Sequence, residues 1–349
     1  MRAILAAECK YGENAYQSPA GLFVNLETDD RLGLNHFKLV AGTAMSYNNW
    51  CDLDRLLQTM THIAATFDIN SHLISASPPR IPGQFIALGA KHGNVCGAGI
   101  SSLGRESAIA KMVTGDLQAL FGGLVMLNFP VDVAEAELLL TYGTESRRIL
   151  DGIIAPEFSS EAIAMLSRKG DKCRFIANPL LAELNRDSLD TAQTFRYVRG
   201  GVLVQPNYTY ILDLGDEELK RYGENLGWGL ADMLIAKAIC DTSNSNTITI
   251  VKDGQLLGNG VGQQSRVSGA ELALGIAEKN DHDIPGSVAA SDSFFPFTDG
   301  PRVLIDKGIQ AIISTSGSVN DYKVIELCKS SNVDLFLIPD KKGRGFYNH

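Results

Sequence analysis

Short apolar runs alternate with amphipathic stretches over the first half of the chain. The runs at 85–90, 124–127 and 152–155 predict buried strands, because each is short, almost entirely apolar and followed by a polar residue or proline. Apolar residues at helical spacing predict helices at 107–113, 116–120, 131–142 and 159–167. Alternating strands and helices are typical of an α/β fold.

A second cycle of the same kind begins near residue 226. The pattern predicts strands at 247–251 and 311–313, with a hairpin-type turn at 252–255. It also predicts helices at 226–240, 270–278 and 321–329. The similar order of elements suggests a duplication, although no residue-level repeat is visible in the sequence.

A weakly patterned segment, 178–210, separates the two cycles. We therefore expect two α/β lobes, the first formed by residues 1–195 and the second by residues 196–349. A chain of 349 residues is too long for a typical single core and suits two packed lobes.

Composition narrows the class of protein. The 45% hydrophobic and 20% charged residues are ordinary for a globular protein, and a net charge of −9 without a basic stripe argues against a nucleic-acid partner. The first residues are charged too early for a secretory signal, and no apolar run is long enough for a membrane span. The 6 cysteines are scattered without a Cys-x-x-Cys pair, so we expect reduced thiols and a cytoplasmic location.

Several common kinds of active site have no motif in this sequence. There is no His-Glu-x-x-His, no His-x-Glu with a paired Cys-x-x-Cys, no Gly-Lys-Ser/Thr and no Gly-x-Ser-x-Gly. Zinc enzymes, P-loop nucleotide hydrolases and serine hydrolases are therefore not expected.

The most distinctive polar pair is Lys91-His92, which follows the predicted strand at 85–90 and precedes a glycine-rich stretch. Ligands bind at the carboxyl ends of strands in α/β sheets, and glycines allow the backbone to approach a ligand closely. The pair offers a cation and a near-neutral base in one place. An isolated Lys-His pair is more often part of a solvated loop, so other motifs must decide.

Aromatic residues gather in the stretch 292–297, Asp-Ser-Phe-Phe-Pro-Phe. Core packing is the ordinary role of such phenylalanines, and the alternative is an apolar wall for a ligand ring with Asp292 at its rim. Arg266 lies among small residues and is suited either to an anion or to an internal salt bridge, whereas Arg344-Gly345-Phe346 near the end could be a frayed tail.

Together these motifs resemble the transformylase domain of the bifunctional purine-synthesis enzyme, aminoimidazole carboxamide ribotide (AICAR) transformylase/IMP cyclohydrolase. The matching stretches, in order, are 10–17, 47–49 with Asp52, Lys91-His92, 121–123, 151–156, 199–205, Ser245-Asn246, 262–266, 291–297 and Arg344-x-Phe346. The family pattern Arg-Tyr-Gly-Glu-Asn-Pro-His-Gln is changed here at Lys10, Ala15 and Tyr16, and the residues after the Lys-His pair are changed at Gly93 and Val95.

The resemblance implies transfer of a formyl group from 10-formyltetrahydrofolate to the 5-amino group of AICAR. It implies catalytic roles for Lys91, His92 and Asn246. It implies that the nucleotide is bound by Lys10, Tyr11, Asn49, Asp151, Arg266, Arg344 and Phe346. It implies that the folate is bound by Phe121, Gly122, Asp292, Phe295 and Pro296.

The resemblance also implies two duplicated, cytidine-deaminase-like three-layer α/β lobes without zinc or another catalytic metal. It implies a homodimer with shared active sites. Because the sequence starts at the transformylase motif, we expect a monofunctional formyltransferase with a separate IMP cyclohydrolase acting downstream, and no nucleic-acid or membrane partner.

Three alternatives remain open. The chain could bind AICAR as a regulator with weakened catalysis, or formylate a different amine. The formyl donor could be free formate with ATP, although the missing ATP motif favours folate.

Overall fold

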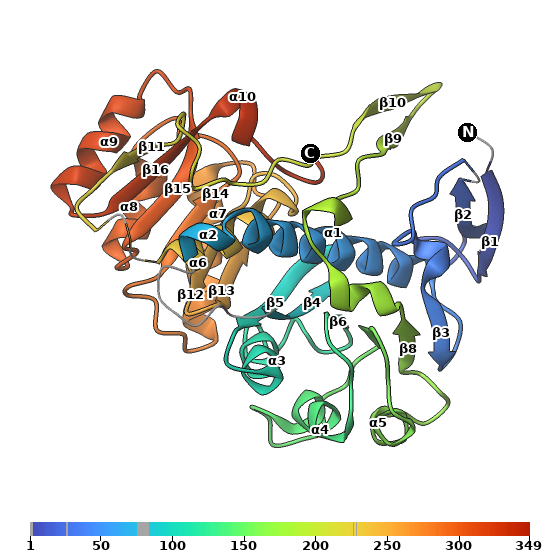
Figure 1. Cartoon of the computed structure of the whole chain (residues 1–349). Coiled ribbons are helices and arrows are strands. Elements are labelled where there is room, and N and C mark those ends of the chain that lie inside the picture. Colours follow the sequence, from blue (N-terminus) through green and yellow to red (C-terminus); the bar gives the residue numbers. More distant parts are fainter. Residues whose placement is uncertain (1–2, 26, 75–83, 226, 228) are drawn as a thin grey trace. The chain divides into compact units, whose positions relative to one another are not determined.

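The computed structural model describes residues 3–25, 27–74, 84–225, 227 and 229–349 (Figure 1). The chain separates into two compact units. The first takes in residues 1–60, 81–184 and 254–256, and the second takes in 61–80, 185–253 and 257–349. The lobe boundary predicted after residue 195 stays a prediction.

The first unit is built on a mixed sheet. Its strands are β3 (Lys38–Ala41), β4 (Phe85–Lys91), β5 (Asn94–Ser101), β6 (Leu124–Leu127), β7 (Gly152–Ala155) and β8 (Arg174–Ala177). They lie in the order β5-β4-β6-β7-β8-β3. β4 is antiparallel to β5 and β6, the next two pairs are parallel, and β3 is antiparallel at the edge.

Helices cover this sheet because its strands are apolar on both faces. The core packs Ile109 and Met112 of α3 (Arg105–Val113), Leu139 of α4 (Val133–Thr141) and Ala162 of α5 (Ser160–Leu166) against Val125 and Ile153 of the sheet. β6 and β7 are buried along their whole length, as expected for the central layer of a three-layer α/β arrangement. Helix α1 (Tyr47–Ile69) begins in this unit, and short 3₁₀ turns occur at η1 (Leu34–His36) and η2 (Pro179–Glu183). The short helix α2 (Ser71–Ile74) and the 3₁₀ turn η3 (Arg186–Ser188) belong to the second unit.

The strands of the second unit also pair in a mixed parallel and antiparallel arrangement. Its strands are β11 (Lys220–Tyr222), β12 (Ile248–Lys252), β13 (Gln255–Gly260), β14 (Val288–Ser291), β15 (Ala311–Ser316) and β16 (Asp334–Pro339), in the order β11-β16-β15-β14-β12-β13. Its helices are α6 (Leu230–Asp241), α7 (Arg266–Lys279), α8 (Asp299–Asp306), α9 (Asp321–Ser330) and α10 (Asp340–Gly343).

The two units repeat one topology. In each unit a helix is followed by a two-stranded hairpin and then by three helix–strand pairs. The first hairpin strand is antiparallel to the strand beside it, β6 or β14, and two parallel pairs follow. In each unit the series ends with an antiparallel edge strand, β3 or β11. The predicted α/β fold is therefore confirmed, and the duplication appears in the strand pairing.

A residue-level repeat also becomes visible in the structure. A Cβ atom added to Gly97 of β5 would lie 2.4 Å from Met112 O of α3, and one added to Gly99 would lie 2.0 Å from Ala108 O of the same helix. Gly258 and Gly260 of β13 stand in the same relation to α7, where the added Cβ atom would lie 2.0 Å from a carbonyl oxygen in both cases. Each Gly-x-Gly lets a helix lie directly on its strand. The expectation that Gly97 and Gly99 serve a ligand is therefore corrected.

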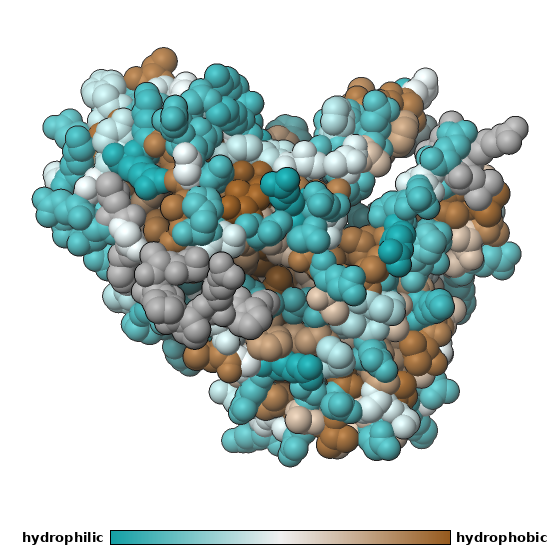
Figure 2. All heavy atoms as spheres, in the orientation of Figure 1, coloured by the Kyte–Doolittle hydropathy of each residue, from teal (hydrophilic) through white to brown (hydrophobic). Residues whose placement is uncertain are grey.

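Two hairpins form separate two-stranded sheets: β1 (Ala3–Cys9) with β2 (Ala20–Asn25), and β9 (Gln193–Val198) with β10 (Gly201–Pro206). Figure 2 shows apolar side chains over the β9–β10 hairpin. Cross-strand pairing puts Phe195 with Val204 and Tyr197 with Val202 on one face, and all four side chains are exposed. The weakly patterned segment predicted between the lobes thus contains an ordered hairpin.

Other sequence expectations need correction. The helix predicted at 116–120 is wrong: this segment forms turns, because the Asp116 carboxylate accepts a hydrogen bond from the Ala119 N–H and glycines follow at once. Part of the helix predicted at 226–240 lies outside the described residues, and α6 begins at Leu230. No helix within the described residues is both long and apolar enough to cross a membrane.

Candidate active site

Lys91-His92 lies at the tip of the β4–β5 hairpin, not in a loop that leads to a helix. Lys91 pairs with Asn94, so His92 and Gly93 are the two turn residues. Their φ angles are 55° and 69°, as a tight hairpin turn requires. Glycine suits the second position because left-handed backbone is unfavourable for other residues. The turn leaves the His92 side chain exposed.

Lys91 points towards the turn that the resemblance assigns to folate. Its Nζ atom donates a hydrogen bond to Phe121 O at 2.6 Å, and the Phe121 side chain is 55% exposed. Gly122 has a φ of 70°, and its N–H donates to Ile149 O at 2.8 Å. Asp151 N–H donates in turn to Gly123 O at 3.0 Å. Lys91, the 121–123 turn and Asp151 therefore belong to one neighbourhood of the first unit.

Asp151 is held by two arginines. Its carboxylate is 3.2 Å from Arg168 Nη1, and its backbone oxygen accepts from Arg174 Nη1 at 3.2 Å. Arg168 Nη1 also donates to Leu150 O at 2.9 Å. Burial and the neighbouring positive charge of Arg168 lower the pKa of Arg174, whereas Asp151 opposes this shift. The carboxylate of Asp151 thus has a fixed direction and is still partly exposed.

Asn49 is engaged at the start of α1. Its Oδ1 atom accepts hydrogen bonds from Ser46 N–H at 3.0 Å and Ser46 Oγ at 2.8 Å, and its own N–H donates to Ser46 Oγ. This reciprocal arrangement satisfies donors that a helix start leaves open. Asn49 is buried, so its amide nitrogen is the atom left for the predicted contact with the nucleotide.

Lys10 and Tyr11 follow β1 and are both exposed. Burial, and after it the negative charge of Glu13, raises the pKa of the Cys51 thiol in α1 to about 11. The stretch that carries Lys10, Tyr11 and Glu13 therefore comes close to α1. The predicted phosphate contacts of Lys10 and Tyr11 stay predictions.

Asp52 was not predicted as a site residue, yet it contacts the Lys-His turn directly. Its Oδ1 atom accepts a hydrogen bond from Gly93 N–H at 2.6 Å. Burial raises the pKa of Asp52, while the Gly93 hydrogen bond and a positive charge on His92 lower it. The only hint in the sequence was the position of Asp52 in the Tyr-Asn-Asn…Asp motif.

The second unit holds Asn246, which follows a cis peptide bond after Ser245. Its backbone N–H and carbonyl both bond to Gln263, and its Nδ2 atom donates to Gln263 O at 2.8 Å. The Asn246 side-chain oxygen stays near the Ser245 hydroxyl at 3.4 Å. The 262–266 motif therefore fixes the orientation of Asn246.

Asp292 is completely buried behind Asn246. Its carboxylate accepts hydrogen bonds from Ser245 Oγ at 2.6 Å and Thr247 N–H at 3.2 Å, and it pairs with Arg266 Nη2 at 3.2 Å. Arg266 Nε is buried without a hydrogen-bond partner among the described atoms. Any effect of Asp292 on folate would therefore run through Ser245 and Arg266, because Asp292 has no exposed surface.

Arg344 is paired with Asp340 through Nε at 3.1 Å and through Nη2, and its guanidinium lies 5.6 Å from the centroid of the Phe294 ring. Burial acts to raise the pKa of Asp340, but hydrogen bonds from Arg344 and Thr315 outweigh it and lower this pKa overall. The next residue, Gly345, donates its N–H to Asp292 O at 3.1 Å. The C-terminal Arg344-x-Phe346 motif thus adjoins the Asp292 cluster.

Phe295 has the ordinary packing role. It is 3% exposed and lies in the core of the second unit with Leu304 and Leu274. Phe295 therefore has almost no exposed ring surface with which to make the predicted contact to a folate. Phe297 is 63% exposed and Pro296 is half-buried, so these neighbours keep the surface that Phe295 lacks.

The predicted residues therefore form two groups, one in each unit. The first unit holds Lys10, Tyr11, Asn49, Lys91, His92, Phe121, Gly122 and Asp151. The second unit holds Asn246, Arg266, Asp292, Phe295, Pro296, Arg344 and Phe346. That both groups serve one active site stays a prediction.

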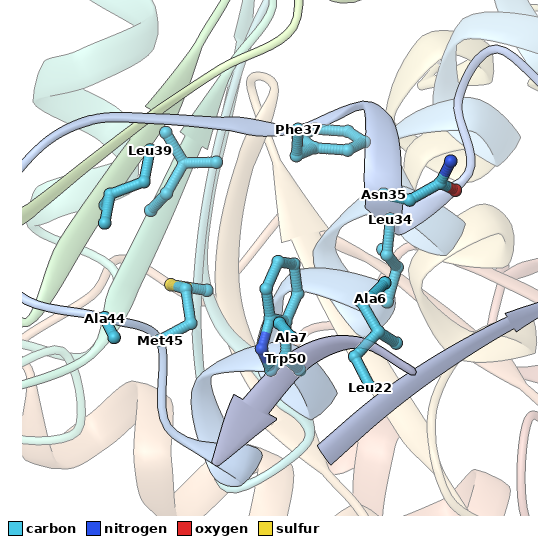
Figure 3. Close-up of a pocket in the computed structure, with 11 residues that line it drawn as sticks. Ala6, Ala7, Leu22, Leu34, Asn35, Phe37, Leu39, Ala44, Met45 and Trp50 are labelled. Atoms are coloured by element: carbon cyan, nitrogen blue, oxygen red, sulfur yellow. The ribbon is translucent and has the colours of Figure 1, made fainter. Parts of the chain in front are cut away.

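A cavity of about 230 Å³ in the first unit is a separate feature (Figure 3). Its lining is mostly apolar and includes Leu22, Phe37, Met45 and Trp50. None of the predicted catalytic or binding residues lines it, and it offers no cation for a phosphate. Among the described residues, no group of three or more His, Cys, Asp or Glu side chains is arranged to hold a metal ion.

Fold and site together define a duplicated α/β protein with a Lys-His hairpin turn in one unit and an Asn-Asp-Arg cluster in the other. The chain belongs to the family described as the AICARFT/IMPCHase bienzyme, which matches residues 2–275.

Its relatives include proteins called bifunctional purine biosynthesis protein PurH. The Aquifex aeolicus relative is 30% identical over 93% of this chain and 56% of its own length. The Cutibacterium acnes relative is 32% identical over 95% of this chain and 57% of its own length. The chain thus spans a little over half the length of these curated relatives. A solved structure described as protein ybgI, of unknown function, aligns with 62% of this chain and 73% of its own chain. Its TM-score is 0.14 and its sequence identity 10%, so this alignment supports no conclusion.

Proposed function

We propose that this chain is an AICAR formyltransferase that uses 10-formyltetrahydrofolate in cytoplasmic purine biosynthesis. The observation that carries the proposal is the contact of Lys91 Nζ with Phe121 O, at 2.6 Å, in a chain of this family. It sets the Lys-His pair against the 121–123 turn and close to Asp151, so groups assigned to catalysis, folate and nucleotide lie in one neighbourhood.

His92 is the proposed general base. The 5-amino group of AICAR is conjugated with its ring and carboxamide, so it is a weak nucleophile that must lose a proton as it attacks. The amine nitrogen bonds to the formyl carbon, and the exposed His92 imidazole takes the amine proton. A positioned acid–base group of this kind contributes about 10²–10⁴-fold to the rate.

Lys91 and Asn246 are the proposed charge-stabilising groups. The formyl oxygen gains negative charge in the tetrahedral intermediate, and a donor already in place stabilises that charge without reorganisation. When the carbon–N10 bond breaks, N10 of the folate takes a proton from the imidazolium or from Lys91. The products are formyl-AICAR and tetrahydrofolate, and the proton count balances.

Positive side chains suit the phosphate of the nucleotide. We propose Lys10, Tyr11, Arg266 and Arg344 for the phosphate and ribose, and Asn49, Asp151 and Phe346 for the base and sugar. Arg266 Nη2 pairs with the buried Asp292 carboxylate, which fixes the direction of the partly exposed guanidinium. Phe121, Gly122 and Pro296 are proposed to contact the folate, and the buried Asp292 and Phe295 are proposed to support the part of the folate site that lies in the second unit.

Steady-state assays separate this proposal from its alternatives. With AICAR and 10-formyltetrahydrofolate, the 349-residue chain should release formyl-AICAR and form no IMP, because its motifs resemble only the transformylase part of the family. Added IMP cyclohydrolase should raise the final conversion without changing the initial rate. AICAR binding without turnover would favour the regulator, faster formylation of another amine would favour a different acceptor, and IMP from this chain alone would contradict monofunctionality.

The exposed β9–β10 face supports a second proposal, a homodimer with shared active sites. Tyr197 is 78% exposed and Val202 58% exposed on a hairpin that pairs with no third strand among the described residues. An isolated hairpin is marginally stable in water, and an uncovered apolar face is typical of an interface.

The double substitution Tyr197→Lys, Val202→Lys should therefore convert the dimer to a monomer in light scattering. Gln205→Lys, on the opposite face of the same hairpin, is the matched control and should stay dimeric. A dimer that survives the double substitution would exclude this face as the interface. Mixed Lys91→Ala and Arg344→Ala chains should regain partial activity if the sites are shared.

A further inference from the structure

The hairpin turn that carries His92 has a counterpart in the second unit. Lys252-Asp253-Gly254 occupies the β12–β13 turn as Lys91-His92-Gly93 occupies the β4–β5 turn. The φ angles of Asp253 and Gly254 are 51° and 73°, against 55° and 69° for His92 and Gly93. The duplicated fold thus contains two turns of the same shape, and only the first has an imidazole.

Each turn is held by an aspartate from the helix that precedes the hairpin. Asp52 of α1 accepts from Gly93 N–H at 2.6 Å, and Asp232 of α6 accepts from Asp253 N–H at 2.7 Å. Asp52 interacts with the backbone N–H groups of both turn residues, Gly93 more strongly than His92, whereas Asp232 accepts from the first turn residue, Asp253. A carboxylate therefore anchors both turns, whatever side chain the turn presents.

The two anchors differ in their electrostatic surroundings. Asp52 is 8% exposed, and its charge interacts favourably with a positive charge on His92 and with Arg55. Asp232 is half-buried beside a turn whose own side chain is an aspartate, so it has no imidazole to act on. Only in the first unit does the anchoring carboxylate lie beside a group that changes charge during the proposed reaction.

From this comparison we infer that Asp52 is a positioning residue for His92. Its buried carboxylate fixes the His92–Gly93 turn through the Gly93 N–H, and its charge stabilises the imidazolium formed when His92 takes the amine proton. The inference rests on the proposed function. Partners that orient a metal-bound histidine change affinity or activity by about 10- to 100-fold when they are replaced, and we expect an effect of the same order for a residue that positions a base.

Asp52→Asn is the informative substitution, because the amide oxygen can still accept from Gly93 N–H while the charge is lost. We expect kcat to fall about 10- to 100-fold with the KM for AICAR unchanged within about twofold. Asp52→Glu restores the charge and should give a higher kcat than Asp52→Asn. Asp232→Asn is the matched control and should leave kcat and KM at wild-type values.

A purely structural role gives a different pattern. In that case Asp52→Asn would keep wild-type kcat, or its loss of kcat would be matched by Asp232→Asn, and either result would overturn the inference. Melting temperatures of all variants show whether a loss of activity is a loss of folding.

Amide hydrogen exchange separates this inference from the proposed function. Gly93 N–H should exchange slowly in the wild type and in Asp52→Asn, and fast in Asp52→Ala. Slow exchange that Asp52→Ala does not change would overturn the anchoring role. A wild-type chain that fails to formylate AICAR, yet shows the expected exchange pattern, would refute the proposed function and the charge role while leaving the anchoring of the turn supported.

Discussion

Lys91→Ala and His92→Ala should each lower kcat for AICAR formylation by about 10²–10⁴-fold, while AICAR still binds. Both side chains act on protons and charge that appear only in the transition state, whereas other residues are proposed to hold the phosphate. Steady-state kinetics give kcat, and calorimetric titration of AICAR gives the affinity.

The duplicated turn supplies the control for this experiment. Lys252 has the position of Lys91 in the second unit, but its Nζ atom is bonded to Asp283 and to Pro285 O at 2.8 Å. Lys252→Ala should therefore keep wild-type kcat. Near-wild-type turnover in either Lys91→Ala or His92→Ala would show that the catalytic pair has been assigned wrongly.

The largest effect on stability is expected at a buried ion pair in the second unit. Lys237 and Asp241 of α6 are 1% and 2% exposed and form a direct ion pair. Lys237 Nζ also donates to Gly343 O at 2.9 Å, and Tyr208 Oη donates to Asp241 Oδ2 at 3.2 Å. Burial raises the pKa of Asp241 to about 7 against the opposing effect of Lys237 and Tyr208, so the carboxylate depends strongly on these partners.

Asp241→Ala should lower the free energy of unfolding by about 3–5 kcal/mol, because it leaves the Lys237 ammonium buried and unpaired. Urea denaturation measures this loss. Glu278→Ala removes an exposed partner of Lys307 and should cost at most about 1 kcal/mol. Replacing both members, in Lys237→Met, Asp241→Leu, should recover much of the loss. Equal, small losses for Asp241→Ala and Glu278→Ala would contradict the account of the buried pair.

The central strands could be predicted from the sequence because their residues are apolar on both faces. Helix α1 was not predicted, since buried polar side chains interrupt its apolar pattern. Asp52, Gln58, Thr59 and Thr66 all lie inside the protein. Asp52 accepts its hydrogen bond from Gly93 N–H in a distant segment, whereas Thr59 Oγ1 donates to Arg55 O within the helix. A periodicity argument assigns such residues to the surface, and their burial becomes apparent only from the tertiary structure.

Strand β5 was missed for a different reason. Its glycines resemble those of a ligand-binding loop, but Gly97 and Gly99 are required by the close approach of α3. Gly258 and Gly260 of β13 lie against α7 in the same way. Local sequence shows that the backbone is approached closely, but it does not show whether a helix or a ligand approaches it.

The candidate site was predictable where a motif is chemically distinctive, as at Lys91-His92. It was less predictable where a side chain works through another residue. Asp52 reaches the turn through a contact across 41 residues of sequence, and Asp292 is buried behind Ser245 and Arg266. Such contacts depend on the packing of whole elements, so a motif can mark the residue without revealing its partner.

The central claim is that this chain moves a formyl group from a folate to AICAR. It is tested most directly with 10-formyltetrahydrofolate labelled at the formyl carbon and an equimolar amount of AICAR, with the product followed by mass spectrometry. The account predicts that the label moves to the 5-amino nitrogen of AICAR with the wild-type chain and much more slowly with His92→Ala. If the label stays on the folate while both substrates are bound, the account is contradicted.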